Sequence, residues 1–249
     1  MKSQIQILAA ILLCATLTTA RAQRGGTVAM AAPTGPSFGG PNALLFGDNS
    51  SFTATMEVQS GSGSSPDVSG KISVSDGKSR LDMDMTKTAS GSSAASAATL
   101  KAYGMDTIAN ISRPDKNVSY MLYPSLNAYV VSTTPQATPA TAGKSKVETT
   151  KLGTETIDGH ACTKNKVVVT DDKGATHEYT VWNADDLKNF PLKFQQTEGG
   201  AESTITFKDV KLDKVDASVF DPPSGAKKYD NMGTLMQQEM MSRMRGRGQ

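Results

Sequence analysis

The stretch that decides the fold is VSGKISVSDGKSRLDMDMT, residues 68–86. Apolar and polar residues alternate on both sides of Asp76-Gly77, and this period of two is typical of strands with one buried face. Asp-Gly between two alternating runs favours a two-residue hairpin turn, since both residues tolerate positive φ. The stretch therefore predicts an antiparallel hairpin with Met83 and Met85 on its apolar side.

The same alternation recurs along most of the chain, with turn signals between the runs. The predicted strands are residues 52–59, 68–75, 80–86, 106–112, 117–123, 128–132, 147–157, 164–170, 176–182, 192–197 and 202–212. Short helices are expected at residues 96–103, at 184–189 behind an Asn183 N-cap, and at 232–245. The pattern predicts a mainly β fold: a single curved antiparallel sheet, a half-barrel of roughly ten strands, with a few short helices against its concave side.

The first 22 residues have the parts of a secretory signal peptide. Lys2 supplies the positive charge, residues 5–17 form an apolar run, and Ala20 and Ala22 are the small residues before a cleavage expected after Ala22. The run of about 13 residues is shorter than the roughly 20 of a membrane-spanning helix. We therefore expect a periplasmic or secreted protein with no transmembrane segment in the mature chain.

Lipid attachment at Cys14 is the alternative, and two features disfavour it. Cys14 lies inside the apolar run, and Leu13 occupies the position where a bacterial lipobox has a small residue. Once the signal is removed, Cys162 is the remaining cysteine, so no disulfide can form within the mature chain. A hydrophobic core must then hold the fold.

Removal of the signal also makes the chain neutral. The precursor has 26 basic and 24 acidic residues, and the signal carries two of the basic ones, Lys2 and Arg21, and no acidic one. The mature chain then has equal numbers of each, which gives no global electrostatic reason to bind nucleic acid.

Composition divides the remainder of the chain into a leader, a domain and a tail. Residues 23–41 are rich in Gly, Pro and Ala and are expected to form a flexible leader. Residues 42–229 are expected to form the β domain, in which residues 133–146 are a disordered excursion. Residues 230–249 form a Met/Arg-rich tail that has helical spacing.

Metal and catalytic chemistry have few candidate residues. His160 and Cys162 share one strand face about 7 Å apart, and a hairpin turn at Asp172-Lys173 pairs Val168 with His177, within a residue. That register leaves His160 roughly 27 Å from His177, so a zinc site from these residues is not expected. No metal ion and no other cofactor is predicted.

A catalytic role for Cys162 is not expected either. His177 is about 20 Å away along the ladder, and His160 has no evident carboxylate to orient it. Asp185 and Asp186 are interpreted as first-turn acids of the predicted helix rather than as a catalytic pair. We therefore predict a protein that is not an enzyme.

The tail carries a methionine-rich strip at helical spacing. Its members are Met232, Leu235, Met236, Glu239, Met240 and Arg243. The favoured interpretation is a C-terminal helix docked on the sheet. A lid over an apolar cavity, a membrane contact through Arg243, Arg245 and Arg247, and a soft-metal site are the alternatives.

Three stretches carry a family resemblance: residues 104–124, residues 159–191, and the ending from Val215-Asp216-Ala217 through Phe220 and Pro222-Pro223 to Tyr229. Together they resemble the DUF4412 family, a domain of unknown function in the bacterial envelope whose fold is similar to the periplasmic lipoprotein carriers (LolA/LolB-like). The resemblance implies an open half-barrel closed by helices over an apolar cavity, which in the true carriers holds lipoprotein acyl chains.

Two hypotheses follow. The first is an exported, non-enzymatic envelope protein that binds an acyl chain, a lipid or a lipoprotein in a concave β-sheet cavity. The second is a structural or interaction protein of the envelope that has a protein partner and no small-molecule ligand. The side chains expected to contact a lipid or partner are Met83, Met85, Trp182, Leu235, Met236 and Met240.

Overall fold

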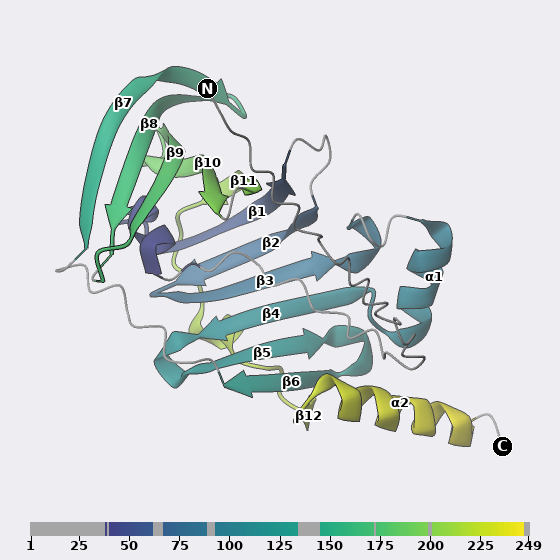
Figure 1. Ribbon diagram of the computed structural model, residues 1–249. Helices are drawn as coiled ribbons and strands as arrows, with labels where there is room; N and C mark the ends of the chain where they lie inside the picture. Colours follow the sequence, from purple (N-terminus) through teal and green to yellow (C-terminus); the bar gives the residue numbers. More distant parts are fainter. Residues whose placement is uncertain are drawn as a thin grey trace, which may run out of the picture. The chain divides into compact units, whose positions relative to one another are not determined.

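Twelve strands form one curved, unclosed sheet in the described part of the computed structural model (Figure 1). The structure describes residue 38 and residues 40–61, 67–88, 93–133, 145–171, 173–198 and 201–246. The predicted signal peptide, most of the predicted leader and most of the predicted excursion lie outside these residues, as do the side chains of Met240 and of residues 243–246. The predicted fold class is confirmed.

The strands are β1 (Ser51–Ser60), β2 (Val68–Ser75), β3 (Lys78–Asp84), β4 (Thr107–Arg113), β5 (Val118–Tyr123), β6 (Ala128–Thr133), β7 (Lys146–Ile157), β8 (His160–Thr170), β9 (Thr176–Ala184), β10 (Phe190–Glu198), β11 (Ala201–Lys211) and β12 (Lys227–Tyr229). Their order in the sheet is β12-β6-β5-β4-β3-β2-β1-β11-β10-β9-β8-β7. The sheet thus consists of two antiparallel meanders, β1 to β6 and β7 to β11, joined by the pairing of β1 with β11.

The hairpin predicted from residues 68–86 is present. Ser75 pairs with Lys78, and the two turn residues Asp76 and Gly77 have φ values of 49° and 76°. Both positive φ values are those of the tight turn that matches strand twist. The second strand ends at Asp84, earlier than predicted, because the Asp84 carboxylate caps a short helix by accepting hydrogen bonds from the Thr86 backbone and hydroxyl.

The helices are η1 (Gly40–Phe46), η2 (Met85–Lys87), α1 (Ala94–Tyr103), η3 (Pro114–Lys116), η4 (Pro124–Leu126), η5 (Ala217–Phe220) and α2 (Met232–Gly246). The helices predicted at residues 96–103 and 232–245 correspond to α1 and α2. The helix predicted at residues 184–189 is wrong. Ala184 ends β9, residues 185–189 form turns, and the Asn183 side chain donates to the Asn189 carbonyl at 2.9 Å instead of capping a helix.

A cluster of phenylalanine rings holds the two meanders together on one face of the sheet, called here the inner face. Phe52 of β1 makes an edge-to-face contact with Phe190 of β10 at 4.8 Å between ring centroids. Phe46 of η1 stacks on Phe52 at 5.3 Å, and Phe207 of β11 lies 5.6 Å from Phe190. Each pair contributes attraction beyond the area it buries.

A C-terminal strap, residues 213–226, lies against the opposite, outer face of β3–β5. Phe220 of η5 is fully buried there, and Arg113 of β4 donates to the Phe220 carbonyl at 3.2 Å and to Asp221 at 2.6 Å. The guanidinium also makes a two-point contact with Asp115, and this hydrogen bonding lowers the pKa of that carboxyl. After the strap, β12 pairs in parallel with the edge strand β6, which places α2 beside the sheet.

We predict that Arg113→Ala loosens the strap. Arg113 is 8% exposed, and its loss leaves the Phe220 carbonyl without this donor and Asp221 with Lys116 alone, so the free energy of unfolding should fall by about 2 kcal/mol. Urea denaturation followed by circular dichroism measures it. Lys87→Ala, which removes an exposed pair with Asp84, is the control and should cost under about 0.5 kcal/mol. Equal losses in the two variants would show that the strap does not depend on Arg113.

Candidate functional site

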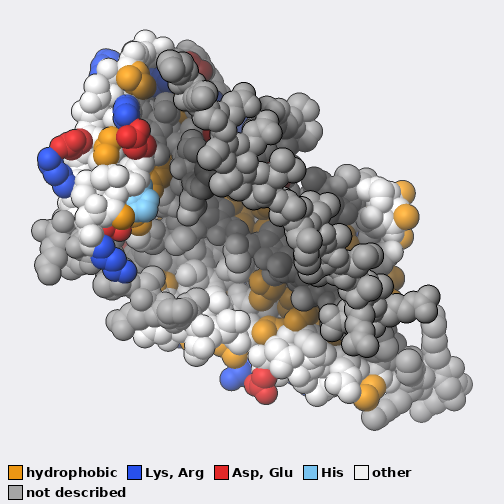
Figure 2. Space-filling model, in the orientation of Figure 1, with side chains coloured by type: hydrophobic (Ala, Val, Ile, Leu, Met, Phe, Trp, Pro, Cys, Tyr) orange, Lys and Arg blue, Asp and Glu red, His pale blue; other side chains and the backbone are white. Residues whose placement is uncertain are grey.

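Mostly apolar side chains cross the inner face of the first meander in two rows of cross-strand neighbours, with Asn110 as the polar member. One row is Met56, Gly70, Met83 and Ile108, and the other is Ala54, Ile72, Leu81, Asn110, Met121 and Val130. Directly opposed side chains on one face of a sheet are close enough to pack. In Figure 2, hydrophobic side chains gather over the middle strands of the sheet.

The first row has a gap in its side chains at Gly70. A Cβ atom at this position would lie 2.4 Å from the Asp82 carbonyl oxygen, so glycine is required where β2 and β3 approach each other. The gap separates Met56 from Met83, which are 0% and 2% exposed. Methionine side chains are unbranched and adaptable, so this part of the inner face can repack around different shapes.

A cavity of about 330 Å³ lies at the Met83 end of this row. Met83, Ile108 and Pro124 form its apolar wall, and Asp82, Asp84 and Thr107 complete the lining. Tyr123, in the same buried cluster, has its pKa raised to about 12 by burial, which keeps the phenol neutral. The volume is at the lower end of the range for small-molecule sites.

The structure brings most of the predicted contact residues into one apolar cluster. Met83 is 2% and Met85 5% exposed, Leu235 of α2 is fully buried, and Met236 is half-buried against the same cluster. The side chain of Met240 lies outside the described part of the chain. These positions are filled by packed side chains, so a ligand at this place must displace or rearrange them.

Trp182 has a different environment from the other predicted contact residues. Its neighbours across the strands are Lys164 and Lys193, whose ammonium groups lie 4.7 and 4.3 Å from the indole centroid, and Nε1 donates to Glu155 at 2.7 Å. Strand alternation puts Trp182 on the opposite face of β9 from Val181, which belongs to the inner face. Trp182 is 2% exposed and belongs to the same buried cluster as Met83 and Met85, and its indole also contacts these charged neighbours.

The environment of His160 differs from the sequence-based expectation. Asp186 orients His160, with its Oδ2 atom 2.7 Å from Nδ1, and Asp185 accepts a hydrogen bond from Thr163 at 3.1 Å. The prediction that His160 lacks a carboxylate is therefore wrong, as is the interpretation of the two aspartates as first-turn acids. Both errors follow from the helix wrongly predicted at residues 184–189. The turn that takes its place after β9 brings the carboxylates of Asp185 and Asp186 to β8.

Cys162 beside this pair is not prepared as a nucleophile. The residue is 1% exposed, and burial raises the pKa of its thiol, with Asp185, Asp186 and Glu155 adding to the rise. A raised thiol pKa lowers the thiolate fraction, the opposite of what nucleophilic catalysis uses. His177 is opposite Val169, within a residue of its predicted partner and far along the ladder from Cys162.

Within the described residues, no three or more His, Cys, Asp or Glu side chains are grouped so that they could hold a metal ion. The helices in this part of the chain also fall short of the length and apolar content needed to span a bilayer.

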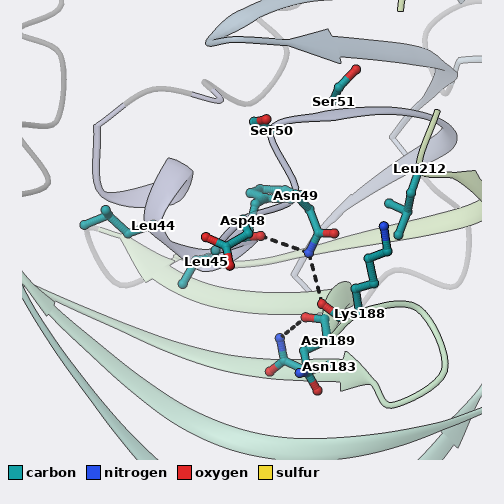
Figure 3. Close-up of a pocket in the computed structure, with 12 residues that line it drawn as sticks. Leu44, Leu45, Asp48, Asn49, Ser50, Ser51, Asn183, Lys188, Asn189 and Leu212 are labelled. Carbon is teal, nitrogen blue, oxygen red and sulfur yellow. Dashed lines mark hydrogen bonds between the residues drawn. The ribbon is translucent and has the colours of Figure 1, made fainter. Parts of the chain in front are cut away.

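A second, more polar pocket of about 710 Å³ lies between η1 and the turn that joins β9 to β10 (Figure 3). Leu44, Leu45 and Leu212 form its apolar part, and Asp48, Asn49, Ser50, Ser51, Asn183, Lys188 and Asn189 supply polar groups. The Asn49 side chain spans the two walls by donating to the carbonyls of Phe46 at 3.0 Å and of Lys188 at 3.2 Å.

Sequence reasoning missed this pocket and the inner-face residues Ile108 and Met121. The alternation of apolar and polar residues in β4 and β5 could have indicated Ile108 and Met121. It does so only once the register of these strands with Met83 is known. The pocket has no such signal, because Asn49 and Lys188 are 139 residues apart in the chain and the turn around Lys188 was predicted as a helix.

Comparison with known proteins yields structural similarities only. No family model and no curated protein matches the chain, so membership of the DUF4412 family is not confirmed. The chain is similar to LppX, a lipoprotein of Mycobacterium tuberculosis, at 13% identity over 68% of this chain and 89% of that one, with a TM-score of 0.39.

Two further solved structures are similar to a comparable extent. LprF of Mycobacterium bovis is 13% identical over 76% of this chain and 99% of its own, with a TM-score of 0.41. A LolA-superfamily protein of Nitrosomonas europaea is 13% identical over 71% of this chain and 92% of its own, with a TM-score of 0.31. These identities and TM-scores are low, so the function proposed below rests on the chain's own residues.

We predict that Cys162 reacts slowly while the protein is folded. Alkylation by iodoacetamide at pH 8, followed by intact-mass spectrometry, should be at least about tenfold slower in buffer than in urea, because the thiol is buried and its pKa is raised. The control is Cys162→Ser combined with Thr150→Cys on exposed β7, which should react at similar rates in both. Fast labelling of native Cys162 would contradict its assignment as an inert core residue.

Proposed function

We propose that this chain is an exported, non-enzymatic protein of the bacterial cell envelope that binds an acyl chain on the inner face of its sheet. The observation that supports this most is the pair of apolar cross-strand rows, which run from β1 to β4 in one case and to β6 in the other. An extended alkyl chain needs an apolar surface and makes no hydrogen bonds, and the rows offer such a surface on either side of the gap at Gly70 and of the half-buried Asn110.

The proposed entrance is the cavity beside Met83. Ile108 and Pro124 line it together with Met83, and the row continues from there across the gap at Gly70 to Met56. An entering chain would displace methionine side chains rather than backbone, which is the least costly rearrangement that a packed core offers. Of the contact residues predicted from the sequence, this proposal keeps Met83, Met85, Leu235, Met236 and Met240, and Trp182 is left out because of its lysine neighbours.

The second candidate function is that of an envelope interaction protein without a lipid ligand. It is favoured by the burial of Met83, Met85 and Leu235, each at most 5% exposed, which leaves a core already filled. The edge strand β7 supports it too, because nearly all of its residues are exposed and, among the described residues, one side of its backbone has no neighbouring strand. Such an edge can pair with an extended segment of a partner protein.

A lipid-binding assay separates the two candidates. We expect the protein beginning at Gln23, purified without detergent, to yield lipid on extraction with organic solvent and mass spectrometry, and to bind the fluorescent fatty acid cis-parinaric acid. Met83→Gln should weaken probe binding about tenfold, because it leaves an amide without partners on the apolar row.

Val147→Gln is the matched control, since Val147 is 45% exposed on β7 and far from the rows in the sheet order. It should bind the probe as the wild type does, and thermal unfolding of both variants shows that they are folded. Absence of extracted lipid together with absence of probe binding contradicts the acyl-chain proposal and leaves the interaction protein.

A further inference from the structure

The polar pocket holds side chains that no contact within the protein uses. Asp48, Ser50, Lys188 and Asn189 line it, all four are exposed to solvent, and none of their side chains has a hydrogen-bond or ion-pair partner among the described residues. Figure 3 shows Asp48 on the η1 side of the pocket, and Lys188 and Asn189 on the side of the β9–β10 turn, with Asn49 between them. A cation and an anion therefore line one pocket without pairing with each other.

The backbone that carries Lys188 and Asn189 is held in an unfavourable conformation. Both residues have positive φ, 51° and 57°, and Lys188 lacks the short side chain that makes this region tolerable for Asn. Such conformations are energetically unfavourable and persist only where the surroundings fix them.

Two asparagine amides fix this turn. Asn49 donates to the carbonyl of Lys188 at 3.2 Å, and Asn183 donates to the carbonyl of Asn189 at 2.9 Å. Asn183 is itself held by Asn165, which donates to its side-chain oxygen at 3.0 Å. The strained turn is thus clamped from β9 and from the end of η1, and its two side chains remain available to the pocket.

The chemistry of the lining selects a class of ligand. Lys188 offers an ammonium and Asn189 an amide, which suit a phosphate, whereas Asp48 and Ser50 offer acceptors for an N–H donor. Leu44 and Leu212 add an apolar wall. A molecule that matches all of these has an anionic group, a primary ammonium group and an apolar continuation.

We propose that this pocket binds phosphoethanolamine as the headgroup of a lipid. The phosphate lies by Lys188 and Asn189, the ammonium group donates to Asp48 and Ser50, and the glycerol end follows the leucines. This inference rests on the proposed lipid-binding function and adds the class of lipid. A trimethylated headgroup lacks the N–H donors that Asp48 and Ser50 require, and a glycerol headgroup lacks the positive charge.

Isothermal titration calorimetry of the protein beginning at Gln23 with short-chain, soluble phospholipids tests the inference. Dihexanoyl phosphatidylethanolamine should bind at least about tenfold more tightly than the dihexanoyl choline or glycerol lipids, the loss expected when one charge-assisted hydrogen bond is missing. Lys188→Gln and Asp48→Asn should each remove most of this preference.

Lys101→Gln on α1 and Asp230→Asn before α2 are the controls, because each removes the same charge from an exposed position outside the pocket. Both should retain the preference. Equal binding of the three lipids, or equal effects of pocket and control variants, overturns the inference.

Free phosphoethanolamine and inorganic phosphate distinguish the sources of the ligand. If the ligand is a lipid headgroup, free phosphoethanolamine should bind more weakly than the lipid and compete with it. Inorganic phosphate should not compete. Phosphoethanolamine that binds as tightly as the lipid overturns the lipid assignment.

The two proposals can fail separately. Lys188→Gln should leave cis-parinaric acid binding unchanged, because the probe has no phosphoethanolamine, whereas Met83→Gln should leave the preference among headgroups unchanged. Probe binding without any headgroup preference contradicts only the pocket inference, and the absence of both contradicts the lipid-binding function itself.

Discussion

The fold depends on the packing of phenylalanine rings at the junction of its two meanders. Each meander is built from hairpins between neighbours in sequence, but the pairing of β1 with β11 joins residues that are about 150 positions apart. Closing a loop of that length costs conformational entropy. Phe52 on β1 offsets this entropy cost by contacting Phe190 and Phe207 of the second meander, while Phe46 of η1 stacks on Phe52.

The positions of both candidate sites, the apolar rows and the polar pocket, depend on this junction. The apolar rows of the first meander continue from β1, on the same face as Phe52, toward β6. The polar pocket forms where η1, fixed by Phe46, meets the turn before Phe190. Removal of the rings would therefore be expected to affect the apolar rows and the pocket together, whereas the residues at the Met83 cavity and at Lys188 can be changed one site at a time.

Local features of this fold could be predicted from the sequence. The Asp76-Gly77 turn and the alternation around it specify the β2–β3 hairpin, because strand period and turn chemistry act within a few residues. The predicted alternation also places Met83 on the buried face, where the structure finds it. The same reasoning brings His177 opposite β8 to within one residue of its observed partner.

Features that depend on distant contacts could not be predicted. The turn at residues 185–189 has helix-like composition, and only the amides of Asn49 and Asn183 reveal why its backbone takes positive φ instead. The wrong helix also concealed Asp186 as the partner of His160. The parallel pairing of β12 with β6 likewise depends on the strap held by Arg113. The local sequence pattern contains no information about this long-range contact.

The central claim is that the inner face binds an acyl chain through its methionines. The most direct test is nuclear magnetic resonance of the protein with carbon-13 methionine methyl groups, in the presence of a fatty acid that carries a nitroxide near the end of its chain. Met56, Met83 and Met121 should lose intensity through paramagnetic relaxation, while Met241, which is 47% exposed on α2, should keep its signal. Unchanged signals from the three inner-face methionines, or equal losses at all four, would contradict binding on this face.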